Sequence, residues 1–203
     1  MSSRKLLEIG GVAAGVLMIA FGIGSLVLGI NARNTVRDEL QREFIVGSDD
    51  MNPADIEKAV ADAGLSDVPI PTCDVAEKEI NTGADARCFA QYMRIHALES
   101  SGGNTYAQMG RFLSADDPGD PKGTSDAAAA AKDEEGAPIT NAARNTWVTE
   151  TALATALNVS YMAEQIALFG IVVGIALLLS GIGFVILALI VLGKHDKPAP
   201  TTT

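Results

Sequence analysis

Two long, uncharged apolar runs constrain this chain more than any other feature of its sequence. Residues 9–30 (22 residues) and 166–193 (28 residues) contain no Asp, Glu, Lys, Arg or His. A helix needs about 20 apolar residues to cross a hydrocarbon core of roughly 30 Å, so each run is long enough to span a bilayer. We interpret the first run as a retained anchor, because it is longer than the apolar core of a signal peptide. The sequence therefore predicts a membrane protein with transmembrane helices at 9–30 and 166–193, in contact with the lipid bilayer.

The segment between the runs, residues 31–165, is strongly acidic. It holds 11 of the 15 Lys and Arg residues and 23 of the 25 Asp and Glu residues, which gives a net charge of 11 − 23 = −12. Nucleic acids and anionic lipid surfaces attract clustered basic residues, and no such cluster occurs here. We therefore expect one acidic domain that does not bind nucleic acid.

The positive charges beside the runs predict the orientation. Arg4 and Lys5 precede the first run, and Lys194 and Lys197 follow the second. The positive-inside rule then places the tails 1–8 and 194–203 in the cytoplasm, and segment 31–165 outside a plasma membrane that the chain crosses twice. Three arginines just after the first run weaken this assignment: Arg33, Arg37 and Arg42.

The two cysteines favour the same orientation. Cys73 and Cys88 are the only cysteines, and both lie between the runs. An even number of cysteines outside the membrane indicates a disulfide; the alternative is a pair of free thiols in a reducing compartment. We expect a Cys73–Cys88 disulfide.

Helical patterns fill most of the middle segment. The first helix should continue past the membrane to Gly47, with Val36, Leu40 and Phe44 as its apolar stripe. Asn52-Pro53 should begin a short helix that Gly64 ends. Further helices are expected over 84–100 and from about residue 141 into the second run, with a mobile loop at 114–135. The predicted fold is all-α: two transmembrane helices extended into a helical stalk, with a small, disulfide-stapled α-helical extracytoplasmic cap.

Small residues follow one face of each apolar run at spacings of three and four. In such runs small residues allow helix backbones to approach closely. Packing between the two helices of one chain and packing between subunits both remain open. The candidate helix-packing residues are Gly11, Gly15, Gly22, Ser25 and Gly29 in the first run, and Gly170, Gly174, Gly181 and Ala188 in the second.

No residue set commits the chain to a reaction. Neither run contains the ionisable residues typical of pumps and ion-coupled carriers. The two histidines, His96 and His195, are expected on opposite sides of the membrane, so they cannot converge on one metal ion. We therefore expect no catalytic residues, no cofactor, no metal and no small-molecule substrate. Arg33 and Glu164 should lie at similar depth and can pair.

Three stretches carry a resemblance to a known family. They are 33–40 (RNTVRDEL), 86–99 (ARCFAQYMRIHALE) and 158–165 (NVSYMAEQ). Together they resemble a family of uncharacterised actinobacterial two-span membrane proteins. Some members carry an automatic label as aromatic ring-opening dioxygenase subunits, an activity that the residues here do not support. The resemblance implies an envelope location and brings no functional residues with it.

These features predict a non-enzymatic cell-envelope protein, a structural, accessory or scaffold subunit. It would recognise itself or another envelope protein through its outer helical domain. The interface candidates lie on the helix at 84–100, and the alternative is that they bury against Val36, Leu40, Phe44 and Trp147. A homo-oligomeric channel built from the glycine-lined helices is the second hypothesis. The interface candidates are Phe89, Tyr92, Met93 and His96.

Overall fold

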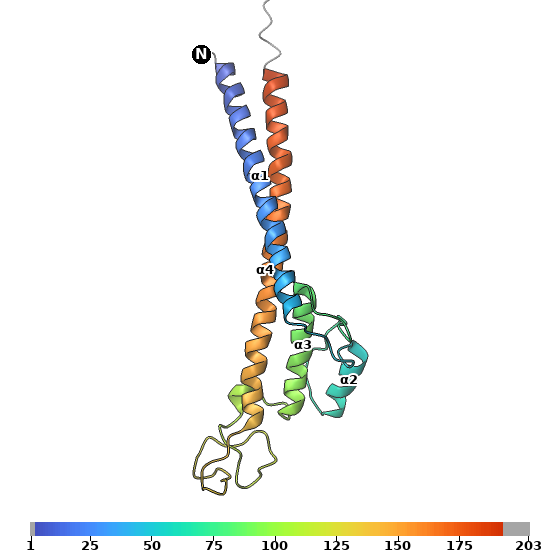
Figure 1. The fold of residues 1–203 in the computed structure, drawn as a ribbon, viewed down its shortest axis with the longest axis vertical. Coiled ribbons are helices and arrows are strands. Elements are labelled where there is room, and N and C mark those ends of the chain that lie inside the picture. The colour runs from blue at the N-terminus through green and yellow to red at the C-terminus, as the bar shows by residue number, and fades with distance from the viewer. Residues whose placement is uncertain (1–2, 193–203) are drawn as a thin grey trace, which may run out of the picture. The chain divides into compact units, whose positions relative to one another are not determined.

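The computed structural model describes residues 3–192, and this range is mostly helical and contains no strand. Figure 1 shows the elements, of which α1 and α4 are long enough and apolar enough to cross a membrane. The predicted tail 194–203, with Lys194, His195 and Lys197, lies outside the described residues. The elements are α1 (Ser3–Arg42), α2 (Pro53–Asp62), α3 (Gly83–Ser100), the 3₁₀ turn η1 (Tyr106–Gln108), α4 (Ala142–Leu187) and the π-helical turn η2 (Ala188–Leu192).

The chain divides into two compact units. The helix-pair unit comprises Met1–Thr35 and Ala163–Thr203, and the middle unit comprises Val36–Met162. Both α1 and α4 contribute residues to each unit.

In the helix-pair unit the buried positions repeat every seven residues. Apart from the buried Glu164, they are Gly15, Gly22 and Gly29 on α1, and Ala167, Gly174, Gly181 and Ala188 on α4 and η2. A seven-residue repeat keeps one face of a helix turned toward its partner. The two helices therefore pack antiparallel along a seam of small residues.

The middle unit has a core built by all four helices. Leu40 of α1, Ile56 of α2, Tyr92 of α3 and Leu157 of α4 belong to one buried cluster. A second, smaller cluster joins α3 to α4 through Leu98 and Trp147, with Ala97 and Met109. Residues of α3 belong to both clusters, and the non-helical residues Met51, Val75 and Ile80 complete the first.

Helix α1 ends earlier than the sequence predicts. It stops at Arg42, and Phe44 has a positive φ of 51°. Beyond it, Ile45 accepts a hydrogen bond from the backbone N–H of Ile80 at 2.9 Å, and the N–H of Gly47 donates to Lys78 at 3.0 Å. The predicted end at Gly47 is wrong, because backbone pairing with a distant segment replaces the last turn of helix. Gly47 is needed for a different reason: a Cβ there would overlap the carbonyl of Val75.

The signals predicted for α2 and α3 are confirmed. The Asn52 side chain accepts a hydrogen bond from the N–H of Asp55 at 3.0 Å, Pro53 opens α2, and Gly64 follows it with φ of 64°. Helix α3 begins one residue before the predicted start, after Thr82, whose hydroxyl caps Asp85 at 3.2 Å.

The segment predicted as a loop contains no helix at 114–135, and backbone hydrogen bonds fix its course. Phe112 and Thr124 exchange bonds of 2.9 and 2.8 Å, and Ala131 donates to Leu113 at 2.9 Å. The buried amide of Asn141 donates to the carbonyls of Gly110 and Pro121. The mobility of this segment stays a prediction.

Candidate functional site

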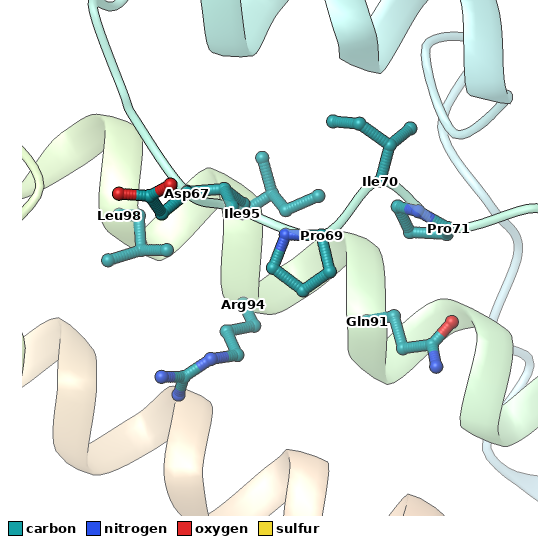
Figure 2. Close-up of a pocket in the computed structure, with 9 residues that line it drawn as sticks. Asp67, Pro69, Ile70, Pro71, Gln91, Arg94, Ile95 and Leu98 are labelled. Atoms are coloured by element: carbon teal, nitrogen blue, oxygen red, sulfur yellow. The ribbon is translucent and has the colours of Figure 1, made fainter.

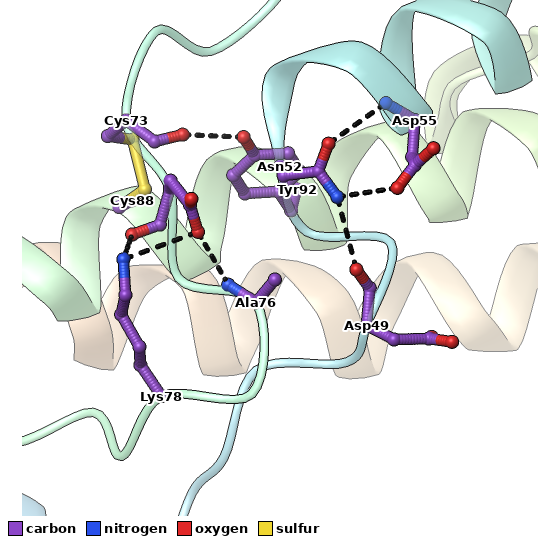
Figure 3. Close-up of polar contacts among 9 residues, drawn as sticks. Asp49, Asn52, Asp55, Cys73, Ala76, Lys78, Cys88 and Tyr92 are labelled. Carbon is purple, nitrogen blue, oxygen red and sulfur yellow. Dashed lines mark hydrogen bonds and ion pairs between the residues drawn. A yellow bond between two sulfur atoms is a disulfide. The ribbon is translucent and has the colours of Figure 1, made fainter.

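A disulfide and a tyrosine tie helix α3 to the segment that precedes it. The predicted Cys73–Cys88 disulfide is present, with a Cα–Cα distance of 6.1 Å. The hydroxyl of Tyr92, one turn along α3, donates a hydrogen bond of 2.6 Å to the carbonyl of Cys73 (Figure 3). Burial, and secondarily the charge of Asp74, raise the pKa of Tyr92 above its ordinary value. The disulfide and this hydrogen bond together restrain Cys73 relative to α3.

The four interface candidates on α3 do not form an exposed patch. Tyr92 is fully buried, while Phe89 and Met93 are half-buried and pack against the core cluster that contains Leu40. His96 is half-buried and lies 2.8 Å from a carboxylate oxygen of Asp50. This arrangement matches the alternative in which these side chains fill the core.

Two of the core partners expected for them lie elsewhere. The side chain of Phe44 is exposed, at 87% of its full accessible surface. Trp147 belongs to the second cluster, where its Nε1–H donates to the hydroxyl of Ser101 at 3.1 Å. The prediction of one stripe from Val36 through Leu40 to Phe44 is therefore wrong at its last residue.

The contact between Asp50 and His96 is part of a small polar group. The hydroxyl of Ser48 donates to the second carboxylate oxygen of Asp50 at 2.6 Å. This hydrogen bond, and next the charge of His96, lower the pKa of Asp50 below its ordinary value, although partial burial opposes the shift. The group joins the loop before α2 to helix α3.

A shallow cavity of about 240 Å³ lies between segment 67–71 and α3 (Figure 2). Pro69, Ile70 and Pro71 form one wall, and Gln91 and Arg94 form part of the other. The guanidinium of Arg94 leaves this cavity and stacks on Trp147, 5.2 Å from the ring centroid. Its positive charge is therefore already in contact with an aromatic ring.

A highly exposed aromatic side chain of the middle unit lies in a different place, just after the end of α1. Phe44 and Val46 are exposed, and Leu153 of α4 is partly exposed near them. Two grooves flank this segment, and both are lined by Leu40 and Ile45. We call the apolar area formed by the exposed residues Phe44, Val46 and Leu153, together with the half-buried Ile45, the Phe44 surface.

The sequence did not predict this surface, because Phe44 continues the i, i+4, i+8 spacing of Val36 and Leu40 that is typical of a buried helix face. The signal that could have found it is weak. Three polar or charged residues, Gln41, Arg42 and Glu43, precede Phe44 and allow the helix to fray before it. The end of α1 depends on the backbone hydrogen bond between Ile45 and Ile80, and these residues are far apart in sequence.

The predicted helix-packing residues meet each other within one chain. A Cβ at Gly22 would lie 2.9 Å from the carbonyl oxygen of Gly174, and one at Gly15 would lie 2.7 Å from that of Gly181. The hydroxyl of Ser25 donates to the carbonyl of Gly170 at 2.7 Å. The remaining members of the seam pair in the same way, Gly29 with Ala167 and Gly11 with Ala188. These contacts lie within one chain; packing between subunits stays a prediction.

An ion pair between α1 and α4 lies one turn beyond Gly29 and Ala167, the last residue pair of the seam. Arg33 Nε lies 2.9 Å from a carboxylate oxygen of Glu164, as the sequence analysis anticipated. The Glu164 side chain is 7% exposed and that of Arg33 is 41% exposed. The carboxylate is thus held largely out of solvent beside its cation.

Within residues 3–192, no group of three or more His, Cys, Asp or Glu side chains converges as metal ligands. No family model, no curated protein and no solved structure matches this chain. The resemblance to actinobacterial envelope proteins stays a prediction.

Proposed function

We propose that this chain is a plasma-membrane protein with two spans and cytoplasmic termini, acting as an accessory or scaffold subunit. Its middle unit lies outside the cytoplasm and binds another protein of the envelope. It carries no catalytic centre of its own.

The observation that carries this proposal is the surface of the helix pair. Large apolar side chains point outward around both helices, including Leu28 and Phe169. Apart from Glu164, the residues that the two helices bury against each other are small, so packing within the pair does not cover this surface. Contact of this apolar surface with lipid tails is favourable, whereas its exposure to water is unfavourable.

Two features of the middle unit support an extracytoplasmic location and a binding role. The Cys73–Cys88 disulfide is typical of oxidising compartments. The unit also exposes an apolar patch, the Phe44 surface, on an otherwise acidic domain. Exposed apolar patches with polar rims commonly mark protein interaction sites.

The topology is tested with single added cysteines, because both native cysteines are in the disulfide. A membrane-impermeant maleimide should label Glu135→Cys in intact cells, and label Thr201→Cys only after permeabilisation. Alkaline carbonate should leave the chain in the membrane. Release by carbonate, or the opposite labelling pattern, would contradict the two-span proposal.

The binding role is tested separately by purification in mild detergent from cells that express the chain naturally. We expect one stoichiometric protein to accompany it. Recovery of a monomer alone would contradict the accessory-subunit role while leaving the topology intact.

A further inference from the structure

We propose that the Phe44 surface is the binding site for a basic amphipathic helix of a partner protein. This inference rests on the proposed function, since it names the surface and the partner chemistry of the same binding role. Three observations carry it: a backbone that presents Phe44 to solvent, two apolar grooves beside it, and an acidic rim.

The backbone at Phe44 is strained. Its φ of 51° lies in the left-handed region, which a bulky side chain rarely adopts. Backbone hydrogen bonds hold it there on both sides, from its own N–H to Gln41 at 3.3 Å and from Ile80 to Ile45 at 2.9 Å. The backbone at this position is therefore restrained, and it presents the aromatic side chain to solvent.

The first groove has a shape that could accommodate a helix. It has a volume of about 350 Å³ and runs between the end of α1 and the middle-unit part of α4. Its α4 wall uses positions 153, 156, 157 and 160, which share one helix face, and its α1 wall includes Leu40. An apolar groove between two helices is the typical site for a third, amphipathic helix.

The second groove extends the apolar area to the other side of Phe44. It has a volume of about 260 Å³ and is lined by Leu40, Phe44, Ile45, Val46 and Ile80, with polar residues at its rim. Because Leu40 and Ile45 line both grooves, one docked helix could contact the whole surface, with Phe44 packed against its side.

The charges around the grooves select a basic partner. Glu39 and Glu43 line the first groove, and Glu79 lines the second. Arg42, the basic residue between Glu39 and Glu43, lies 3.1 Å from Glu39 and offsets its charge, so Glu43 and Glu79 are the main acidic groups of the rim. The middle unit as a whole holds 10 Lys and Arg against 22 Asp and Glu, a net charge of 10 − 22 = −12. A second copy would bring the same acidic rim, so Lys and Arg of another protein complement this surface better.

The test uses a synthetic helical peptide as the probe. It has about 18 residues, roughly 27 Å of helix, with Leu on one face and Lys along both flanks. The matched peptide has Glu in place of Lys. The full-length chain is held in nanodiscs of neutral phospholipid, and binding is measured by fluorescence anisotropy against empty nanodiscs.

We expect saturable binding of the Lys peptide, weakened at least about tenfold by Phe44→Ser, as for an interface anchor. Val148→Ser is the control, since Val148 is exposed on α4 but lines neither groove. Glu43→Gln and Glu79→Gln together should weaken binding and reduce its salt dependence. Phe44 is exposed, so its replacement should leave Trp147 fluorescence unchanged.

Three results would overturn the proposal. Equal binding of the Glu peptide would remove the charge selection, and equal binding to empty nanodiscs would make lipid the partner. A wild-type dimer that Phe44→Ser dissociates would show that a second copy occupies the surface. All three leave the carbonate and labelling results untouched, so failure of this inference is distinguishable from failure of the two-span proposal.

Discussion

The hydroxyl of Tyr92 reaches the backbone carbonyl of Cys73, 19 residues earlier, across a 2.6 Å hydrogen bond. The tyrosine and the disulfide thus restrain the same residue by two independent means. Tyr92→Phe should lower the free energy of unfolding of the middle unit by about 1–2 kcal/mol, because it leaves an acceptor without its donor. The fluorescence of Trp147, the only tryptophan, reports this unfolding in urea. Tyr106→Phe is the control: Tyr106 is exposed, and its ring contact with Arg144 survives the change.

Removing the disulfide should be more costly than removing that hydrogen bond. The bridge joins residues 15 apart, which in the chain-entropy model corresponds to about 3 kcal/mol. Replacing both cysteines by serine should therefore shift the urea midpoint of Trp147 fluorescence further than Tyr92→Phe does. Reaction of the native, non-reduced chain with a thiol reagent would show that the bridge is absent.

The glycine seam allows a closely matched pair of variants. A Cβ at Gly22 would lie 2.9 Å from the backbone of α4, whereas one at Gly24 would meet nothing within 4 Å. Gly22→Ala should destabilise the helix pair by about 1–3 kcal/mol, the usual cost of overpacking. Gly24→Ala should be neutral or slightly stabilising. Thermal unfolding in detergent, followed by helical circular dichroism, compares the two. Equal effects would mean that the helices do not pack along this seam.

Two of the arginine–glutamate pairs on α1, Arg33–Glu164 and Arg42–Glu39, should differ in energy. Arg33 binds a carboxylate that is 7% exposed, while Arg42 binds Glu39 in an exposed pair. We expect Arg33→Ala to cost about 1–3 kcal/mol and Arg42→Ala less than about 0.5 kcal/mol, because a buried charge that loses its partner is poorly solvated. The same detergent unfolding measurement serves for both variants. A larger loss for Arg42→Ala would contradict the burial of Glu164.

The Ser48–Asp50 contact predicts a pH dependence with a definite sign. The pKa of Asp50 is lower in the folded chain than its ordinary value of 3.8, first because of the Ser48 hydrogen bond. The folded state thus binds this proton less readily, so the contact stabilises the fold above about pH 4 and the stabilisation is lost as the pH falls through the lowered pKa. Ser48→Ala should be less stable than the wild type near pH 6, with the gap closing near pH 2. A gap that is independent of pH would contradict the assignment.

Much of this fold could be predicted, because its signals are local. The two runs give α1 and α4, the Asn52-Pro53 pair starts α2, and two cysteines leave only one possible bridge. Such features depend on residues within a turn or two, or on simple counting. The prediction failed at Phe44, where helical periodicity was outweighed by the pairing of Ile45 with Ile80, 35 residues away in sequence (80 − 45 = 35).

The candidate site was harder to predict for the same reason. Phe89, Tyr92 and Met93 are the residue types favoured in interfaces, but the same types fill cores, and only tertiary packing separates the two roles. Likewise, the spacing of the glycines shows that something approaches closely. It does not show that Gly174 is what meets Gly22.

The seven-residue interval of the seam has a mechanical consequence. Sliding α1 along α4 by four residues, about 6 Å, would bring Met18, which lies on the same helix face, to the crossing that Gly22 occupies. Only a slide of a full repeat, about 10 Å, would restore the fit. A piston movement of about one helix turn between the two helices is therefore sterically blocked.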